Sequence, residues 1–173
     1  MTEGPFRTAM VLAAGRGERM RPLTTVLPKP ALPLPDGPVV ASALRLAAEA
    51  GATRIVVNVC HLPKRMAEAV AMLRLEGPEI VLSYEQEQIG SAGGLALARD
   101  RGLLGHEGAV LVINGDGVLG LELHSLADRH LAGNDLVTLA LLPHLDPERW
   151  SRVTLDSDGR IEAILVPGSP DAF

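Results

Sequence analysis

Short apolar segments alternate along the chain with segments of helical character, and this alternation limits the possible folds more than any other feature. The apolar segments carry few polar positions, which is typical of strands in a parallel sheet that helices cover on both faces. We therefore predict a doubly wound α/β domain with a mostly parallel, mixed sheet. The predicted strands are Phe6–Ala13, Arg54–Val59, Glu79–Tyr84 and Ala109–Ile113, and the predicted helices are Val39–Ala50, Pro63–Leu75, Ala92–Arg99 and Leu121–Leu131.

The last third of the chain contains further strand-like segments. We predict strands over Leu136–Leu142, Val153–Leu155 and Arg160–Val166. The sequence Asp-Ser-Asp-Gly at Asp156–Gly159 separates the last two and predicts a hairpin turn. The end of the chain, from Val166 to Phe173, is rich in proline and glycine and predicts a loop.

Composition excludes several classes of protein. The chain has 173 residues and a formal net charge of −5, and it lacks a basic stretch of the kind that binds along a nucleic-acid backbone. It also lacks an apolar run long enough to span a bilayer, and its first seven residues have no signal-peptide layout. Cys60 is the single cysteine, so an internal disulfide is impossible. We expect a cytoplasmic protein that binds neither nucleic acid nor membrane.

A proline-rich segment follows the first predicted strand. Six of the thirteen prolines lie between Pro22 and Pro38. This density disfavours regular helix and strand, so it predicts a long, stiff loop. Loops of this length in compact domains are usually functional, and ligands of α/β sheets bind beyond the carboxyl ends of the strands. We therefore expect the ligand site where this loop leaves the sheet.

Glycines and basic residues open this loop. Gly15 and Gly17 come directly after the strand, where glycines let backbone N–H groups approach phosphate oxygens closely. Positive charge follows at Arg16, Arg19, Arg21 and Lys29 in an otherwise acidic chain. The dinucleotide fingerprint fails because its third glycine would be Met20, and the Gly-Lys-Ser/Thr of a Walker A loop is absent. The glycines alone fit a tight turn with a solvated basic loop equally well.

A second polar group, Asn114-Gly115-Asp116, ends the fourth predicted strand. A carboxylate at a carboxyl edge is well placed to hold Mg²⁺, a hard ion that prefers oxygen ligands. Asp-Gly pairs are also common turns, so the position alone does not decide between a metal ligand at Asp116 and a turn residue.

The whole string from Leu12 to Pro30 resembles the signature of the sugar-1-phosphate nucleotidylyltransferases, Leu-Ala-Ala-Gly-x-Gly-x-Arg-Met-x-Pro-Leu-Thr followed by Pro-Lys-Pro. The resemblance implies a Rossmann-like nucleotidyltransferase fold. It implies that Arg19 binds the triphosphate, that Lys29 lies near the reacting phosphates, and that Asp116 holds Mg²⁺ as the cofactor. The implied nucleotide-binding residues of the loop are Leu12, Ala13, Ala14, Gly15, Arg16 and Gly17.

The segment Glu85–Leu95 corresponds to the part of this family that reads the base, with Glu85 five residues before Gly90. Its Ile-Gly-Ser-Ala-Gly-Gly-Leu is similar to the Leu-Gly-Thr-Ala-Gly-Ala-Leu of mannose-1-phosphate guanylyltransferases. A carboxylate accepts hydrogen bonds, and guanine offers adjacent N1–H and N2–H₂ donors. The resemblance therefore implies GTP as the first choice of NTP, with UTP or dTTP possible. A hexose 1-phosphate, mannose first, is the implied second substrate, and a homo-oligomer is possible.

The resemblance weakens after Gly117. The family's sugar-binding lysine is replaced by Val166, and its second metal-binding carboxylate lies in a segment beyond Phe173. We expect a single nucleotidyltransferase domain over 1–173, with a nucleotide-binding part at 6–117 and an incomplete sugar-binding part at 118–173. We also expect these 173 residues to bind nucleotide and turn over poorly. One alternative is a nucleotide-binding regulatory module with impaired catalysis. Another is a cytidylyl- or molybdopterin-type nucleotidyltransferase, against which the Pro-Leu-Thr and Pro-Lys-Pro segments argue.

Overall fold

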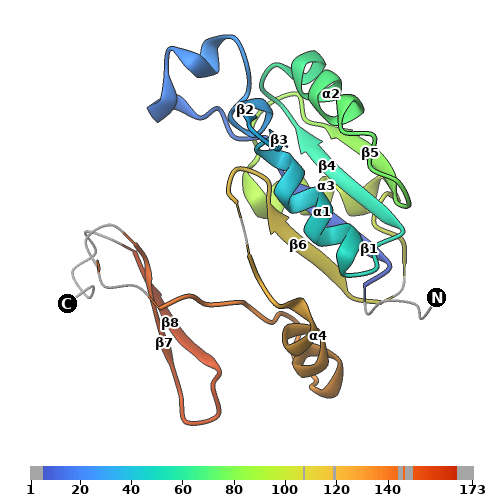
Figure 1. The fold of residues 1–173 in the computed structure, drawn as a ribbon. Helices are drawn as coiled ribbons and strands as arrows, with labels where there is room; N and C mark the ends of the chain where they lie inside the picture. The colour runs from blue at the N-terminus through green and yellow to red at the C-terminus, as the bar shows by residue number, and fades with distance from the viewer. Residues whose placement is uncertain (1–5, 107, 119, 144–145, 147–149, 167–173) are drawn as a thin grey trace. The chain divides into compact units, whose positions relative to one another are not determined.

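The structure, a computed structural model, describes residues 6–166 except 107, 119, 144–145 and 147–149 (Figure 1). The chain divides into two compact units, residues 1–134 and 135–173. The proline- and glycine-rich loop predicted at the end of the chain lies, after Val166, outside the described residues. In the described residues, no helix is long and apolar enough to cross a membrane.

The first unit contains a parallel sheet of four strands, which confirms the predicted fold class. The sheet has the order β5-β4-β1-β6, and every neighbouring pair is parallel. The strands are β1 (Thr8–Leu12), β4 (Arg54–Val59), β5 (Glu79–Tyr84) and β6 (Val110–Asn114). Leu12 pairs in register with both Asn58 and Asn114, and Asn58 pairs with Ser83. The carboxyl ends of all four strands therefore meet along one edge.

Helices cover both faces of the sheet. They are α1 (Val40–Glu49), α2 (Pro63–Met72), α3 (Gly90–Asp100) and α4 (Leu123–Ala132). Residues of α1, α2 and α4 pack in one core with alternate strand residues such as Val11 and Val57. Ala98 of α3 packs in a second core with Met10 and Val56, whose side chains point to the opposite face. In Figure 1, α1 crosses in front of the sheet and α3 lies behind it.

The proline-rich segment contains short elements rather than a featureless loop. The 3-10 turn η1 (Glu18–Met20) comes just before it, and two further turns lie within it at η2 (Leu23–Thr25) and η3 (Lys29–Ala31). A two-stranded antiparallel ladder then joins β2 (Pro33–Leu34) to β3 (Gly37–Pro38). Such short turns suit proline because its ring fixes φ and its nitrogen carries no hydrogen.

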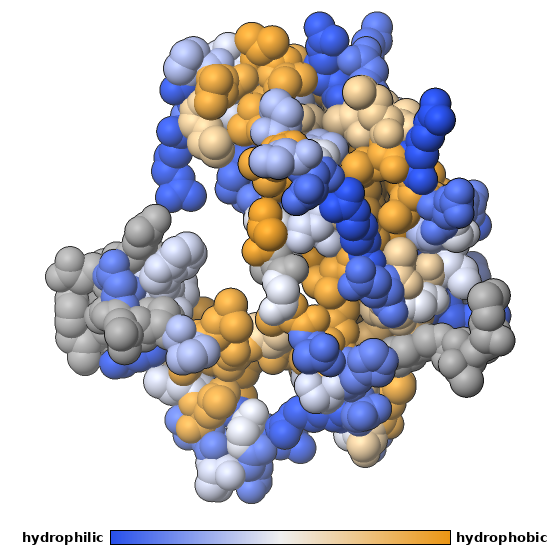
Figure 2. Space-filling view, in the orientation of Figure 1, coloured by the Kyte–Doolittle hydropathy of each residue, from blue (hydrophilic) through white to orange (hydrophobic). Residues whose placement is uncertain are grey.

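The second unit contains the predicted hairpin, β7 (Arg152–Leu155) and β8 (Ile161–Leu165), joined by the predicted turn. The Asp156 carboxylate stabilises this turn by accepting hydrogen bonds from the backbone N–H groups of Asp158 and Arg160. The predicted strand Leu136–Leu142 is wrong, because this segment pairs with no other strand among the described residues. Its apolar side chains are exposed, up to 97% for Leu136, and contribute to the orange surface of this unit in Figure 2.

Candidate functional site

A row of hydrogen bonds joins the four strands where their carboxyl ends meet. The N–H of Gly115 donates to the carbonyl of Leu12 at 2.9 Å, which links the end of β6 to β1. The N–H of Ala13 then donates to Oδ1 of Asn58 at 2.7 Å, and Nδ2 of Asn58 donates to Oε1 of Glu85 at 2.7 Å. The start of the glycine loop and the predicted base-reading residue are therefore connected through one buried amide.

The polar groups at the β4–β5 end of this row are deeply buried. Asn58 is 3% exposed, Ser83 1% and Glu85 7%. Among the described residues, Oε2 of Glu85 and Oγ of Ser83 are buried without a hydrogen-bond partner. An unpaired buried polar atom costs free energy, so such groups commonly mark places that bind water or a ligand. Glu85 is thus a buried carboxylate, although it stands directly after the end of a strand.

Helix α3 covers the Asn58–Glu85 pair at Gly94. A Cβ at Gly94 would lie 2.7 Å from Nδ2 of Asn58 and 2.7 Å from Oε1 of Glu85. Only glycine lets the helix backbone approach this hydrogen bond so closely. Gly90, for which the sequence predicts contact with the nucleotide, is the first residue of α3 and has a φ of +77°.

The glycine loop has one open and one constrained glycine. Gly15 is exposed, and a Cβ there would meet no atom of the described chain within 4 Å. Gly17 has a φ of +61°, and its Cβ would lie 2.9 Å from Thr24 and 3.1 Å from Lys29. Thr24 is buried and donates its hydroxyl to the Gly17 carbonyl at 2.9 Å. Gly17 is therefore needed for the backbone conformation of the loop, whereas the space beside Gly15 is open.

The structure brings together two residues that the sequence predicts separately as functional. Nζ of Lys29, on η3, lies 2.7 Å from Oδ2 of Asp116, which follows β6. The two side chains are 32% and 52% exposed, so the pair is accessible to solvent and to a ligand. A cation and a carboxylate in contact at the carboxyl edge can neutralise phosphate and hold a divalent ion, respectively.

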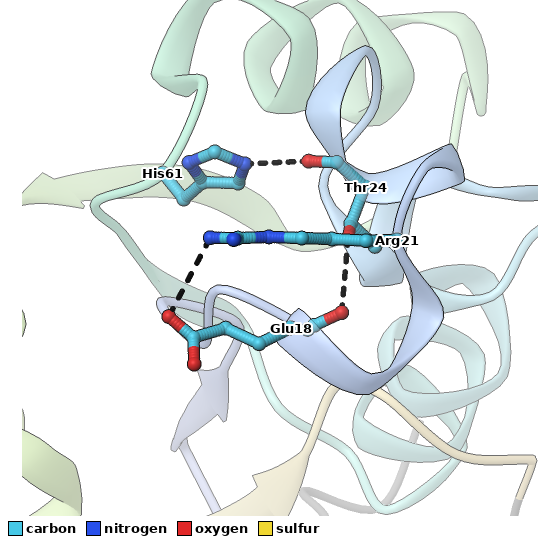
Figure 3. Close-up of polar contacts among 5 residues, drawn as sticks. Glu18, Arg21, Thr24 and His61 are labelled. Carbon is cyan, nitrogen blue, oxygen red and sulfur yellow. Dashed lines mark hydrogen bonds and ion pairs between the residues drawn. The ribbon is translucent and has the colours of Figure 1, made fainter.

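A polar cavity of about 320 Å³ lies between the loop that follows β1 and the end of β4. It is lined by Arg16, Arg21, Thr24, Thr25, Cys60, His61, Leu62 and Gln86. Nε2 of His61 donates to the Thr24 carbonyl at 2.7 Å, and Arg21 pairs with Glu18 at 3.6 Å (Figure 3). Cys60 is half-buried at this cavity rather than part of the apolar core.

The remaining predicted residues flank these features. Leu12 is half-buried and Ala14 buried at the end of β1, while Arg19 is exposed on η1. Sequence reasoning assigned no role to Asn58 or His61. The only available signal was their position at the end of an apolar strand, which is the edge where ligands of α/β sheets bind.

The described residues contain no group of three or more His, Cys, Asp or Glu side chains that could enclose a metal ion. Mg²⁺ does not require such a group, because it keeps several waters and is commonly held by one or two carboxylates plus substrate phosphates. Asp116 offers one such carboxylate.

Comparisons with known proteins place this arrangement among nucleotidyl transferases. The Nucleotidyl transferase family model matches residues 8–165. Mannose-1-phosphate guanylyltransferase of Mycobacterium tuberculosis is 32% identical over 91% of this chain and 43% of its own length. Mannose-1-phosphate guanyltransferase of Schizosaccharomyces pombe is 34% identical over 84% of this chain and 40% of its own length. The chain therefore spans about two fifths of the length of these curated relatives.

The fold also matches solved structures. A putative glucose-1-phosphate thymidylyltransferase from Bacillus anthracis, crystallised with sucrose, has a TM-score of 0.75 and 22% sequence identity. The match covers 94% of this chain and 65% of that chain. At this level of identity the likeness concerns the fold.

Proposed function

Since the chain belongs to the nucleotidyl transferase family, we propose that it supplies the nucleotide-binding part of a sugar-1-phosphate nucleotidylyltransferase. Such an enzyme transfers a nucleotidyl group from an NTP to a sugar 1-phosphate and releases pyrophosphate. The observation that carries the proposal is the contact of Lys29 with Asp116 beside the glycine loop, at the edge where four parallel strands end. The relatives that carry these named activities are more than twice as long as this chain.

The proposed reaction is an in-line displacement at the α-phosphorus of the NTP. A phosphate oxygen of the sugar 1-phosphate forms the new bond to this phosphorus, and the bond to the bridging oxygen of the β-phosphate breaks. Pyrophosphate leaves with that electron pair. Chemistry of this kind depends on positioning and on neutralising charge rather than on a covalent nucleophile.

The residues of the chain divide this work between them. Backbone N–H groups of the glycine loop hold the phosphates, with Gly15 leaving the space that they need. Arg19 and Lys29 supply positive charge to the triphosphate, and Lys29 exchanges its partner Asp116 for a phosphate oxygen. Asp116 is then available to hold Mg²⁺, which supplies charge neutralisation when bound.

We assign GTP as the first choice of nucleotide and mannose 1-phosphate as the first choice of sugar, ahead of UTP or dTTP and other hexose 1-phosphates. Oε2 of Glu85 is a buried acceptor without a partner among the described residues, and the N1–H and N2–H₂ groups of guanine are donors that suit it. The two relatives described above are named as mannose-1-phosphate guanylyltransferase and mannose-1-phosphate guanyltransferase, and these names support the same choice.

Calorimetry and a pyrophosphate-release assay test this function. We expect the chain to bind GTP more tightly than UTP, dTTP or ATP. Lys29→Ala should weaken GTP binding at least about tenfold, as expected for a lost charge-assisted contact worth about 1.5–3 kcal/mol. The matched control is Lys64→Ala, which removes the only other lysine from an exposed position on α2.

Pyrophosphate release is measured with Mg²⁺, GTP and mannose 1-phosphate, with UTP and glucose 1-phosphate as the comparison. Release that depends on both substrates would establish the reaction. Tighter binding of pyrimidine nucleotides would overturn the choice of base, and equal GTP affinity in the two lysine variants would remove Lys29 from the site.

A further inference from the structure

The side-chain amide of Asn58 can adopt only one orientation. Its neighbour on one side is the N–H of Ala13, a backbone donor that cannot accept a hydrogen bond. The amide oxygen Oδ1 must therefore face Ala13, at 2.7 Å, and the NH₂ group must face the other way. Because the backbone fixes this choice, the orientation does not depend on how the two ends of the amide are assigned.

This orientation determines what residue 85 presents to Asn58. Nδ2 can only donate, so the atom that contacts it must be an acceptor, here Oε1 of Glu85 at 2.7 Å. The second atom of the carboxylate, Oε2, is then the one that remains for a ligand, and it is buried without a partner among the described residues. Glu85 as a whole is 7% exposed, so its carboxylate has little freedom to rotate into solvent.

Two further contacts hold this arrangement in place. The backbone of α3 at Gly94 lies so close that a Cβ would stand 2.7 Å from both atoms of the Asn58–Glu85 hydrogen bond. The N–H of Glu85 donates to the carbonyl of Val59 at 2.8 Å, which continues the ladder between β4 and β5. The pair is therefore enclosed by the sheet on one side and by a helix on the other.

We propose that Asn58 is a positioning residue that fixes the polarity of the group which side chain 85 turns toward the nucleotide base. The inference rests on the proposed function, since it takes residue 85 to read the base. With glutamate, Asn58 leaves an acceptor facing the base, which selects bases with donors on that edge. With glutamine, Asn58 would hold the amide oxygen and turn the NH₂ donor toward the base.

The experiment compares Glu85→Gln with the double variant Asn58→Asp/Glu85→Gln. In the single variant a donor replaces the acceptor that faces the base. In the double variant the carboxylate introduced at position 58 accepts from the N–H of Ala13 and from the glutamine NH₂, so the glutamine oxygen faces the base again. GTP, whose N1–H and N2–H₂ are donors, is compared with ATP, whose N1 is an acceptor, by calorimetry.

We expect Glu85→Gln to weaken GTP binding at least about fivefold without weakening ATP binding, a size typical of base discrimination by paired hydrogen bonds. The double variant should recover most of the lost GTP affinity. A Glu85→Gln variant that keeps the GTP preference would overturn the inference, because it would show that the amide rotates freely. A double variant that folds and fails to recover GTP binding would also overturn it.

A measurement without nucleotide separates this inference from the proposed function. Asn58→Asp alone places two carboxylates in contact in a buried site, so its melting temperature should fall well below that of the unmodified chain. Adding Glu85→Gln should restore the melting temperature, because the hydrogen bond returns with donor and acceptor exchanged. Equal melting temperatures of the Asn58→Asp and double variants would overturn the positioning role. The double variant could also recover its melting temperature while the unmodified chain shows no preference for GTP over ATP. In that case the base assignment of the proposed function fails, and the role of Asn58 toward a base fails with it.

Discussion

An alanine at position 94 should destabilise the protein, although alanine normally stabilises a helix. Gly94 lies inside α3, where replacing glycine by alanine contributes about 1 kcal/mol of stability through helix propensity. Here the added Cβ would lie 2.7 Å from Nδ2 of Asn58 and from Oε1 of Glu85, a separation that neither atom tolerates. The helix or the buried pair must move.

The magnitude follows from three contributions. Forcing a methyl group into a filled site costs about 1–3 kcal/mol. Breaking a buried hydrogen bond to a charged group costs about 1.5–3 kcal/mol. With the gain in helix propensity of about 1 kcal/mol subtracted, Gly94→Ala should lower the free energy of unfolding by roughly 1.5–5 kcal/mol.

Urea unfolding of Gly94→Ala and Gly93→Ala measures this difference in neighbouring positions of one helix. At Gly93 the Cβ would meet the side chain of Ile89 at 3.0–3.5 Å, and Ile89 is 41% exposed and can give way. We expect Gly93→Ala to change the free energy of unfolding by less than about 1 kcal/mol in either direction. Equal stability of the two variants, or a more stable Gly94→Ala, would refute the close packing of α3 on the Asn58–Glu85 pair.

Three other changes test the site. Gly15→Val should weaken NTP binding at least about tenfold, or about 1.4 kcal/mol, because its side chain would occupy the space proposed for the phosphates. The melting temperature should stay unchanged, since the added Cβ meets no atom of the described chain, and unchanged NTP affinity by calorimetry would contradict the prediction. Asp116→Ala should abolish Mg²⁺-dependent pyrophosphate release in any active form while changing the free energy of unfolding by at most about 1 kcal/mol, since its pair with Lys29 is exposed; full activity would make it a turn residue. Asn58→Ala should lower the free energy of unfolding in urea by about 2–5 kcal/mol, because the buried N–H of Ala13 and the buried carboxylate of Glu85 lose their partner. The control Asn134→Ala, at an exposed position, should lower it by less than about 0.5 kcal/mol, and similar losses in the two variants would argue against a buried network.

The parallel sheet could be predicted from sequence because its strands are mostly apolar and regularly separated by helices. The predicted bounds of Arg54–Val59 and Glu79–Tyr84 are those that the structure has. The same reasoning failed at Leu136–Leu142, where an apolar pattern is present and no strand of the described residues pairs with it. An apolar pattern indicates that a segment suits a strand, and it carries no information on whether a partner strand is available.

The site could be predicted less completely than the sheet, because hydrogen-bond partners lie far apart in the chain. Lys29 and Asp116 could each be named as candidates from the sequence, but their contact joins positions 87 residues apart and could not be predicted. Asn58 carries no motif of its own, and its importance comes from Ala13, 45 residues earlier, and Glu85, 27 residues later. The burial of Glu85 depends on the position of Gly94, which the sequence shows only as one glycine among several.

The place of β1 in the sheet delays the completion of the sheet during synthesis. β1 leaves the ribosome before the other strands of its sheet, yet it lies inside the sheet, with Thr8 pairing with Arg54 on one side and with Val110 on the other. The first partner is made 46 residues later and the second 102 residues later. At a translation rate of about 5–20 residues per second, one edge of β1 stays without its strand for roughly 5–20 s. During that interval the nascent chain presents an apolar strand with an unpaired edge, and such an edge is a template for pairing with other chains.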